Sequence, residues 1–247
     1  MKNSCESFVQ ERVAWLQTKS KEAGTKGLIV GLSGGIDSAV VANLIKRAFP
    51  EDSMAVILPI SSNDKDREDA LLVAEKAGIY YETIEMSTTH TAMMEQIFAL
   101  PRLKAHTNMH SKKISDANLR ARLRMSALYA IANALDYMVV GTDNAAELYT
   151  GYFTKYGDGG VDLLPIADLL KREVYEMARH FEVPVSVLEK APSAGLWNGQ
   201  TDEDEMGITY AKIDDFLDGI EIPEKDRQVI EKMHKQSRHK REMPPIP

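Results

Sequence analysis

The segment Ser33–Ser38, of sequence SGGIDS, constrains the fold of this chain more than any other. It follows an apolar run at residues 27–32 and precedes a helix-forming run at residues 39–47. A strand, a glycine turn and a helix in this order aim backbone N–H groups and the positive end of a helix at a ligand. The glycines let the backbone approach that ligand, and Asp37 supplies a carboxylate of the kind that binds Mg²⁺. We therefore expect a phosphate chain with its metal ion on this turn.

Strand-like and helix-like runs alternate through the first 141 residues. Short apolar runs predict strands at 27–32, 54–59, 79–84 and 137–141. Helical spacing of apolar residues predicts helices at 4–22, 39–47, 69–77, 88–99 and 115–135. The alternation predicts an α/β fold, with a doubly wound parallel sheet flanked by helices, in a single domain over residues 1–247. Ligands of such sheets bind beyond the carboxyl ends of the strands.

The composition disfavours several classes of protein. A net charge of −7 argues against nonspecific nucleic-acid binding as the main role. No apolar run approaches the roughly 18 residues of a membrane-spanning helix, and the N-terminus lacks the apolar core of a signal peptide. We therefore expect a cytoplasmic protein with neither a membrane nor a nucleic acid as partner. The single cysteine, Cys5, excludes an internal disulfide and a C-x-x-C zinc or redox site.

Two stretches and the C-terminus depart from the regular pattern. Residues 149–165 are too rich in glycine for a helix and too aromatic for a linker, and residues 190–207 are polar and irregular. Long irregular segments inside a compact domain are usually functional or disordered, so we expect two flexible loops. Residues 234–247 form a basic tail that either binds a ligand or is disordered. Its last five residues, MPPIP, cannot be helical.

A second candidate ligand-binding segment follows the fourth predicted strand, at residues 141–147 of sequence GTDNAAE. Thr142 and Glu147 leave the strand where a ligand at the sheet edge would lie. Glu147 is a candidate partner for Asp37 on one Mg²⁺ ion, because carboxylates and phosphate oxygens together make an oxygen-rich site. The spacing favours equally a carboxylate that stabilises the first turn of a helix.

The motifs together resemble a known family. SGGIDS is not a Walker A loop, which needs a lysine, but it resembles the S-G-G-x-D-S loop of the ATP pyrophosphatases, which split ATP between the α and β phosphates. The whole chain is similar to the ammonia-dependent NAD⁺ synthetases. This resemblance also rests on GTDNAAE and on residues 151–165, 171–174, 191–197, 200–207 and 239–241. The segments at 151–165 and 200–207 are the more specific, because other ATP pyrophosphatases lack them.

The resemblance implies roles for individual residues. Asp37 and Glu147 would hold Mg²⁺, and Lys171 and Asp162 would be catalytic, with Asp162 orienting or deprotonating ammonia. The implied ATP-binding residues are Gly31, Leu32, Ser33, Gly34, Gly35, Ile36, Asp37, Ser38, Thr142, Lys171 and Ser193. The implied residues for the second substrate, deamido-NAD⁺, are Arg122, Lys155, Asp162, His239 and Lys240. Without the resemblance, the alternative for Lys155 and for Lys171 is a solvated surface charge. Relatives often carry Thr at position 193 and His at position 144.

The reaction that the resemblance implies is the last step of NAD⁺ biosynthesis. The nicotinate carboxylate of deamido-NAD⁺ attacks the α-phosphorus of ATP and expels pyrophosphate, and ammonia then displaces AMP from the acyl adenylate to give NAD⁺. Glutamine-dependent relatives carry a glutaminase domain with a nucleophilic cysteine. We expect no such domain here, because the synthetase pattern uses the whole chain and Cys5 lies in no hydrolase motif. The resemblance also implies a homodimer.

Two other functions stay open at this point. The first is a different adenylating enzyme or a tRNA-modifying pyrophosphatase, which would be expected to show a basic face or a pair of working cysteines. The second is a non-catalytic nucleotide-binding or sensor protein. The presence of Asp37, Glu147 and Lys171 argues against this second alternative.

Overall fold

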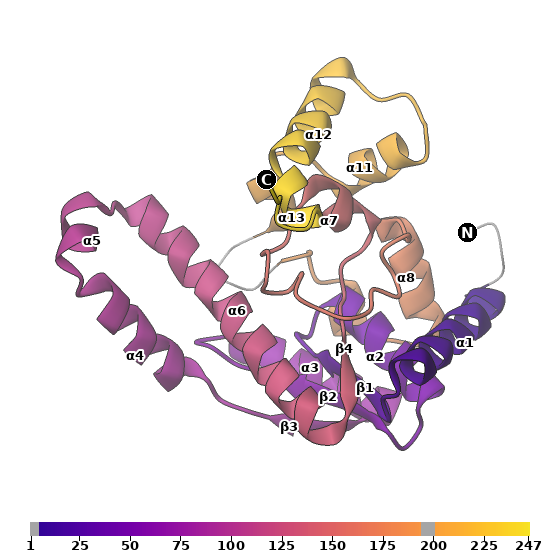
Figure 1. Ribbon diagram of the computed structural model, residues 1–247. Coiled ribbons are helices and arrows are strands. Elements are labelled where there is room, and N and C mark those ends of the chain that lie inside the picture. The colour runs from indigo at the N-terminus through magenta and orange to yellow at the C-terminus, as the bar shows by residue number, and fades with distance from the viewer. Residues whose placement is uncertain (1–4, 194–200) are drawn as a thin grey trace.

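A parallel sheet with helices on both faces forms the body of the protein in a computed structural model, which describes residues 5–193 and 201–247 (Figure 1). Within these residues the sheet has four strands in the order β3-β2-β1-β4, each paired in parallel with its neighbour. The strands are β1 (Gly27–Gly31), β2 (Ser53–Ile57), β3 (Tyr80–Thr83) and β4 (Tyr137–Val140). This architecture confirms the predicted doubly wound α/β fold.

The central strand β1 is apolar throughout because helices cover both of its faces. Successive strand residues point to opposite sides of a sheet. Leu28 and Val30 therefore share a core with helices α1 (Cys5–Ala23), α2 (Ile36–Ala48), α3 (Asp64–Ala77) and α8 (Lys171–His180). Ile29 packs instead against Leu128 and Ala132 of helix α6 (Met109–Leu135) on the opposite face.

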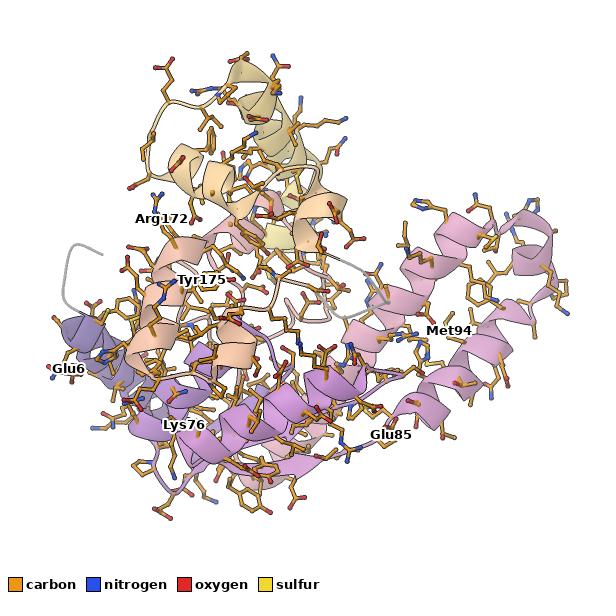
Figure 2. All side chains as sticks on the ribbon, turned by 180° about the vertical axis from the view of Figure 1, so that it is seen from behind. Glu6, Lys76, Glu85, Met94, Arg172 and Tyr175 are labelled. Carbon is orange, nitrogen blue, oxygen red and sulfur yellow. The ribbon has the colours of Figure 1, made fainter. Side chains whose placement is uncertain are left out.

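Helix α6 begins at Met109, six residues before the predicted start. Asn108 caps it: its side-chain oxygen accepts a hydrogen bond from the Ser111 amide at 2.8 Å. The added first turns are largely exposed and therefore carry no apolar periodicity. Together with α4 (Ser87–Phe98) and α5 (Pro101–His106), they form an arm that projects from the body (Figures 1 and 2). Helix α5 was not predicted.

The C-terminal part of the chain builds a second, smaller core beside the carboxyl ends of the strands (Figure 1). Ala146, Met206, Ile213 and Ile230 belong to it. They come from helices α7 (Ala145–Thr150), α10 (Asp202–Met206), α11 (Tyr210–Leu217) and α12 (Glu224–Gln236). Two further short helices are α9 (Val185–Leu188) and α13 (Arg238–Arg241).

The irregular stretches differ in part from expectation. Helix α7 extends to Thr150, so the irregular loop begins at residue 151. Further along this loop, an isolated β-bridge between Leu163 and Val140 connects it to the sheet. The predicted loop at 190–207 contains helix α10, which Thr201 caps by accepting from the Asp204 amide at 3.2 Å. Residues 194–200 of that loop lie outside the described residues. Residues 234–241 of the basic tail are helical apart from Ser237, and the MPPIP end forms no helix.

No helix within the described ranges is both long and apolar enough to cross a membrane.

Candidate active site

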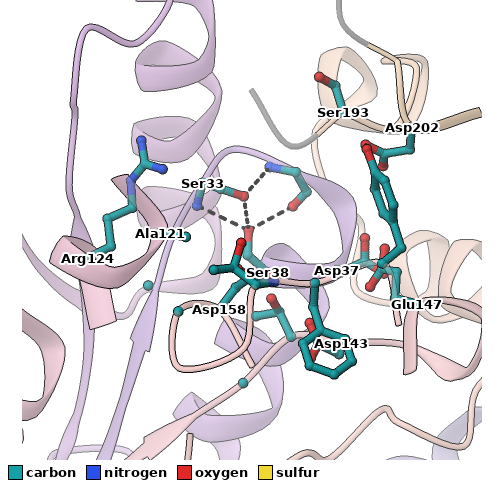
Figure 3. A pocket seen from close by; sticks show the side chains of 18 of the residues that line it. Ser33, Asp37, Ser38, Ala121, Arg124, Asp143, Glu147, Asp158, Ser193 and Asp202 are labelled. Carbon is teal, nitrogen blue, oxygen red and sulfur yellow. Dashed lines mark hydrogen bonds between the residues drawn. The ribbon is translucent and has the colours of Figure 1, made fainter. Parts of the chain in front are cut away.

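A cavity of about 530 Å³ opens where strands β1, β2 and β4 end (Figure 3). The carboxyl ends of parallel strands lie at one edge of a sheet, so the segments that follow these strands meet there. The lining includes the glycine turn, the end of β2, part of α6, residues 141–143 and much of the 151–161 loop. The cavity therefore joins the two segments that the sequence proposed as halves of one site.

The glycine turn is held in a closed shape by its own serines. The Ser38 hydroxyl donates to the Gly35 carbonyl at 3.0 Å and lies 3.1 Å from the Ser33 hydroxyl. Gly34 has a φ of +76°, and a Cβ at this position would lie 2.3 Å from the carbonyl oxygen of Asp66. The turn is therefore packed against α3 from behind, and the N-terminus of α2 is aimed into the cavity.

Lys171 joins the two acidic residues predicted to hold a metal. Its ammonium group lies 2.6 Å from Asp37 Oδ2 and 3.5 Å from Glu147 Oε1. The Lys171 side chain is only 3% exposed. Burial raises the pKa of Glu147 to about 7, and the positive charge of Lys171 opposes this rise. Burial would lower the pKa of Lys171, but the charges of Asp37 and Glu147 raise it above its ordinary value. The structure thus places these three residues in one buried charge cluster.

Asn144 positions both carboxylates of the cluster. Its side-chain amide donates to Asp37 Oδ1 at 2.9 Å, and its backbone amide donates to Glu147 Oε2 at 3.1 Å. Its side-chain oxygen also accepts from the Glu147 amide at 3.1 Å, which caps α7. Glu147 is therefore the first-turn helix carboxylate of α7, and Asn144 and Lys171 also connect it to Asp37; its role as a metal ligand stays a prediction.

The residues implied for the second substrate fall into two places. Arg122 donates to the Lys155 carbonyl at 3.3 Å, and the Lys155 ammonium donates to the His239 carbonyl. Among the described residues these three do not line the cavity, whereas Lys240 does. Lys240 donates to the carbonyls of Gly151 and Phe153 at 2.7 and 2.6 Å, so it fastens the glycine loop to the C-terminal helix α13.

Asp162, predicted to orient ammonia, is engaged in the fold instead. Its carboxylate accepts from the Tyr129 hydroxyl and from the Val139 amide, both at 2.8 Å. It is not among the described residues that line the cavity. The carboxylates that do face the cavity in this region are those of Asp143 and Asp158 (Figure 3). The expected role of Asp162 therefore finds no support in its position.

Known proteins resemble the chain over its full length. The sequence model of NAD synthase matches residues 8–244. The chain belongs to the NAD synthase family. It is 59% identical to an NH(3)-dependent NAD(+) synthetase of Alkaliphilus metalliredigens, with 97% of each chain covered. It is 58% identical to the enzyme of the same name from Alkaliphilus oremlandii, covering 100% of this chain and 99% of the relative. These relatives confirm the predicted family and the predicted enzyme class, a ligase.

Solved structures of the NAD synthase family share the fold. An NMN synthetase from Francisella tularensis has a TM-score of 0.92 and 41% identity, with 99% of each chain covered. An NH3-dependent NAD synthetase from Campylobacter jejuni, in complex with the nitrate ion, has a TM-score of 0.81 and 29% identity, again with 99% of each chain covered. The two names differ in the nucleotide product.

Several charged residues of this NAD synthase site were missed by sequence reasoning. Asp143 is 5% exposed, and burial followed by the nearby charges of Asp158, Glu147 and Asp37 raises its pKa well above the ordinary value. Arg124 lines the cavity and donates to the Leu58 carbonyl at 3.0 Å, and burial together with repulsion from Arg120 lowers its pKa to about 10. Asp143 could have been predicted from the sequence, because it lies within GTDNAAE, the second candidate ligand-binding segment. For Arg124, nothing in the sequence distinguished it from the neighbouring arginines, Arg120 and Arg122.

Lys190 is a further missed residue, and it braces the glycine turn. Its ammonium group contacts Asp66, lies 3.5 Å from Asp69 Oδ2 and donates to the Gly34 carbonyl at 3.4 Å. Asp69 is 2% exposed and keeps a second partner, the Ser186 hydroxyl, at 2.7 Å. Lys190 thus connects the turn, the start of α3 and the segment before Ser193.

We expect Lys190→Met to lower the free energy of unfolding by about 1–3 kcal/mol, because it leaves the buried Asp69 carboxylate without its cation. It should also weaken ATP binding, since the Gly34 carbonyl loses its brace. The matched control is Lys76→Met. The Lys76 ammonium pairs with Glu182 at 2.9 Å, but both side chains are at least half exposed, so its loss should cost under about 1 kcal/mol. Urea unfolding and calorimetric ATP titration measure the two effects; equal losses in both variants would contradict the brace.

Proposed function

We propose that this chain uses ATP and free ammonia to amidate the nicotinate carboxylate of deamido-NAD⁺, giving NAD⁺, AMP and pyrophosphate. The observation that carries the proposal is the buried cluster of Asp37, Lys171 and Glu147 beside the glycine turn. The names of the Alkaliphilus relatives support this product and this nitrogen donor.

The glycine turn would hold the phosphates of ATP. Its backbone amides and the N-terminus of α2 supply positive potential without a cost of reorganisation. Thr142 and Ser193 line the same cavity and would add hydroxyl contacts. Lys171 would neutralise charge that develops on the departing pyrophosphate. The protein's contribution is then the positioning of the two substrates and the stabilisation of charge, and no covalent enzyme intermediate is required.

Asp37 and Glu147 would hold a magnesium ion. Their carboxylates are hard oxygen donors, and they already share one positive charge, so the arrangement fits a cation. When bound, the ion would supply charge neutralisation for the phosphate oxygens. Asn144 keeps the second segment of the site next to the turn through its hydrogen bond to Asp37.

Ammonia would be received beside Asp143 and Asp158. These carboxylates face the cavity from the 141–143 and 151–161 segments and create a negative potential there. Such a potential attracts the ammonium ion, which is the predominant form of ammonia at neutral pH. A carboxylate of raised pKa accepts a proton from that ion more readily, and burial raises the pKa of both Asp143 and Asp158.

The residues Arg122, Lys155 and His239 would bind the far half of a dinucleotide. They form a connected row outside the cavity, and Lys240, which follows His239 in the chain, lines the cavity. A dinucleotide has a length that suits a cavity with such an extension. We propose that a second copy of the chain completes this extension in a homodimer.

Nicotinate mononucleotide is a second candidate substrate. The similarity to the Francisella tularensis NMN synthetase favours it, as does a cavity whose described lining does not include Arg122, Lys155 or His239. Both substrates present the same carboxylate to ATP, so the chemistry of the proposal is unchanged.

The test is pyrophosphate release from ATP, Mg²⁺ and ammonium, with deamido-NAD⁺ or nicotinate mononucleotide as acceptor. We expect release to depend on an acceptor, with kcat/KM higher for deamido-NAD⁺. A higher kcat/KM for the mononucleotide would assign the chain to the second candidate. Release that does not depend on either acceptor would overturn both, and chromatography of the amide product identifies which was made.

A further inference from the structure

All four carboxylate oxygens of Asp37 and Glu147 are bound by donors of the protein itself. Asp37 Oδ1 accepts from the Asn144 side chain and Oδ2 from Lys171, at 2.9 and 2.6 Å. Glu147 Oε2 accepts from the Asn144 amide at 3.1 Å, and Oε1 accepts from the Tyr210 hydroxyl at 2.9 Å. The Lys171 ammonium also reaches Glu147 Oε1, at 3.5 Å. The position shared by the two carboxylates is therefore filled by a cation of this chain.

The base and the tip of Lys171 are held differently. The backbone amides of Lys171 and Arg172 each donate to the carboxylate of Asp214 at 2.9 Å, which fixes the start of α8. The ammonium group at the tip is held by the two carboxylates and by the face of the Tyr210 ring, whose centroid is 4.6 Å away. A lysine side chain has four flexible carbons, so its tip can move to a new anion while its backbone stays in place.

A lysine ammonium and a divalent cation cannot share this position. Both would lie within a few ångströms of the same oxygens in a site of low dielectric, where like charges repel strongly. To bind here, a free divalent cation must therefore displace the Lys171 ammonium group from both carboxylates. The displaced ammonium group then has no new negative partner, which disfavours binding of the metal alone. ATP changes this balance, because its phosphates offer Lys171 new negative partners in the same cavity.

We propose that Lys171 holds the metal position in the nucleotide-free protein and that the divalent cation enters only together with ATP. The proposal rests on the proposed function for the identity of the nucleotide. It assigns Lys171 two successive partners: the carboxylate pair before binding and the phosphates after it. It also predicts ordered binding, in which the metal–nucleotide complex is the species that the site accepts.

The test is titration of the nucleotide-free protein with Mn²⁺ at pH 8. Electron paramagnetic resonance measures the free Mn²⁺ at each point of the titration and so gives the dissociation constant. We expect wild-type protein to bind Mn²⁺ weakly and Lys171→Met to bind it at least about tenfold more tightly. Lys240→Met is the matched control, because it removes one positive charge from the same cavity but its ammonium group is bonded to backbone carbonyls. We expect the control to change the dissociation constant by less than about threefold.

The double variant Lys171→Met/Glu147→Gln locates the effect, because it should lose the Mn²⁺ affinity that Lys171→Met gains. Equal gains in Lys171→Met and Lys240→Met would overturn the proposal, since the effect would then be one of overall charge. An affinity of the wild-type protein for Mn²⁺ equal to that of Lys171→Met would also overturn the proposal.

A second measurement uses wild-type protein alone, in case the variant does not fold. Mn²⁺ is titrated with and without the non-hydrolysable analogue α,β-methylene-ATP, against the analogue without protein. Retention of Mn²⁺ by the protein only when the analogue is present supports the proposal; tight binding in its absence overturns it. Neither titration contains an amidation substrate, so failure of the amidation assay and failure of this inference are separate results.

Discussion

Asp37→Asn is expected to lower kcat/KM for ATP-dependent amidation by about 10²–10³-fold while the protein stays folded. The variant keeps the shape of the side chain and removes the negative charge that faces the Lys171 ammonium at 2.6 Å. A neutral amide binds a divalent cation far more weakly than a carboxylate does. Steady-state kinetics with saturating ammonium measures the loss, and circular dichroism shows whether the fold is retained.

The control for Asp37→Asn is Asp64→Asn. Asp64 also lies in the first turn of a helix, α3, but it is exposed and does not line the cavity. Removing its charge should leave kcat/KM within about twofold, with a stability change of a few tenths of a kcal/mol. Near-normal turnover in Asp37→Asn would remove Asp37 from the proposed metal site.

Gly151→Ala is expected to destabilise the protein by about 1–3 kcal/mol more than glycine-to-alanine replacement at an open left-handed position. Gly151 ends helix α7 with a φ of +71°, and a Cβ there would lie 2.1 Å from the Cβ of Ser237. Ser237 is 7% exposed, and its hydroxyl donates to the Thr150 carbonyl at 2.9 Å. The added methyl group must push the end of α12 away from the loop that Lys240 fastens.

The comparison for Gly151→Ala is Gly78→Ala. Gly78 ends helix α3 with a φ of +63°, and a Cβ there would meet nothing within 4 Å. This variant should show only the cost of the left-handed backbone, about 1–2 kcal/mol. Urea unfolding of both variants separates the cost of the left-handed backbone from the cost of the overlap with Ser237. Equal losses in the free energy of unfolding would show that Ser237 moves aside without cost.

Strands β1 and β2 were predictable because burial on both faces leaves a continuous apolar signal. Residues 27–32 and 54–59 could form little else, and both contain strands. The first turns of α6 and the short helix α5 were not predictable in the same way. Their side chains are mostly exposed in a projecting arm, so no apolar period marks them.

The choice between neighbouring residues of one type required the tertiary structure. Arg122 and Arg124 are two positions apart on α6 and therefore point to different sides of the helix. Arg124 lines the cavity, whereas Arg122 contacts Lys155 outside it. The choice between Asp158 and Asp162 also required the tertiary structure, because the spacing of residues in an irregular loop does not indicate where their side chains point. The resemblance implied a role for Asp162, yet Asp158 faces the cavity.

The sequence by itself determined the parallel sheet, the glycine turn at its edge and the meeting, at that edge, of the segments that carry Asp37 and Glu147. Each follows from local rules: apolar runs form buried strands, and parallel strands end at one edge. The tertiary structure alone decided that Lys171 stands between these carboxylates. The two partners Lys171 and Asp37 are 134 positions apart in the chain, and only the packing of α8 against α2 in the common core brings them within 2.6 Å. Local sequence patterns do not predict such a contact, because the contact depends on how whole helices pack.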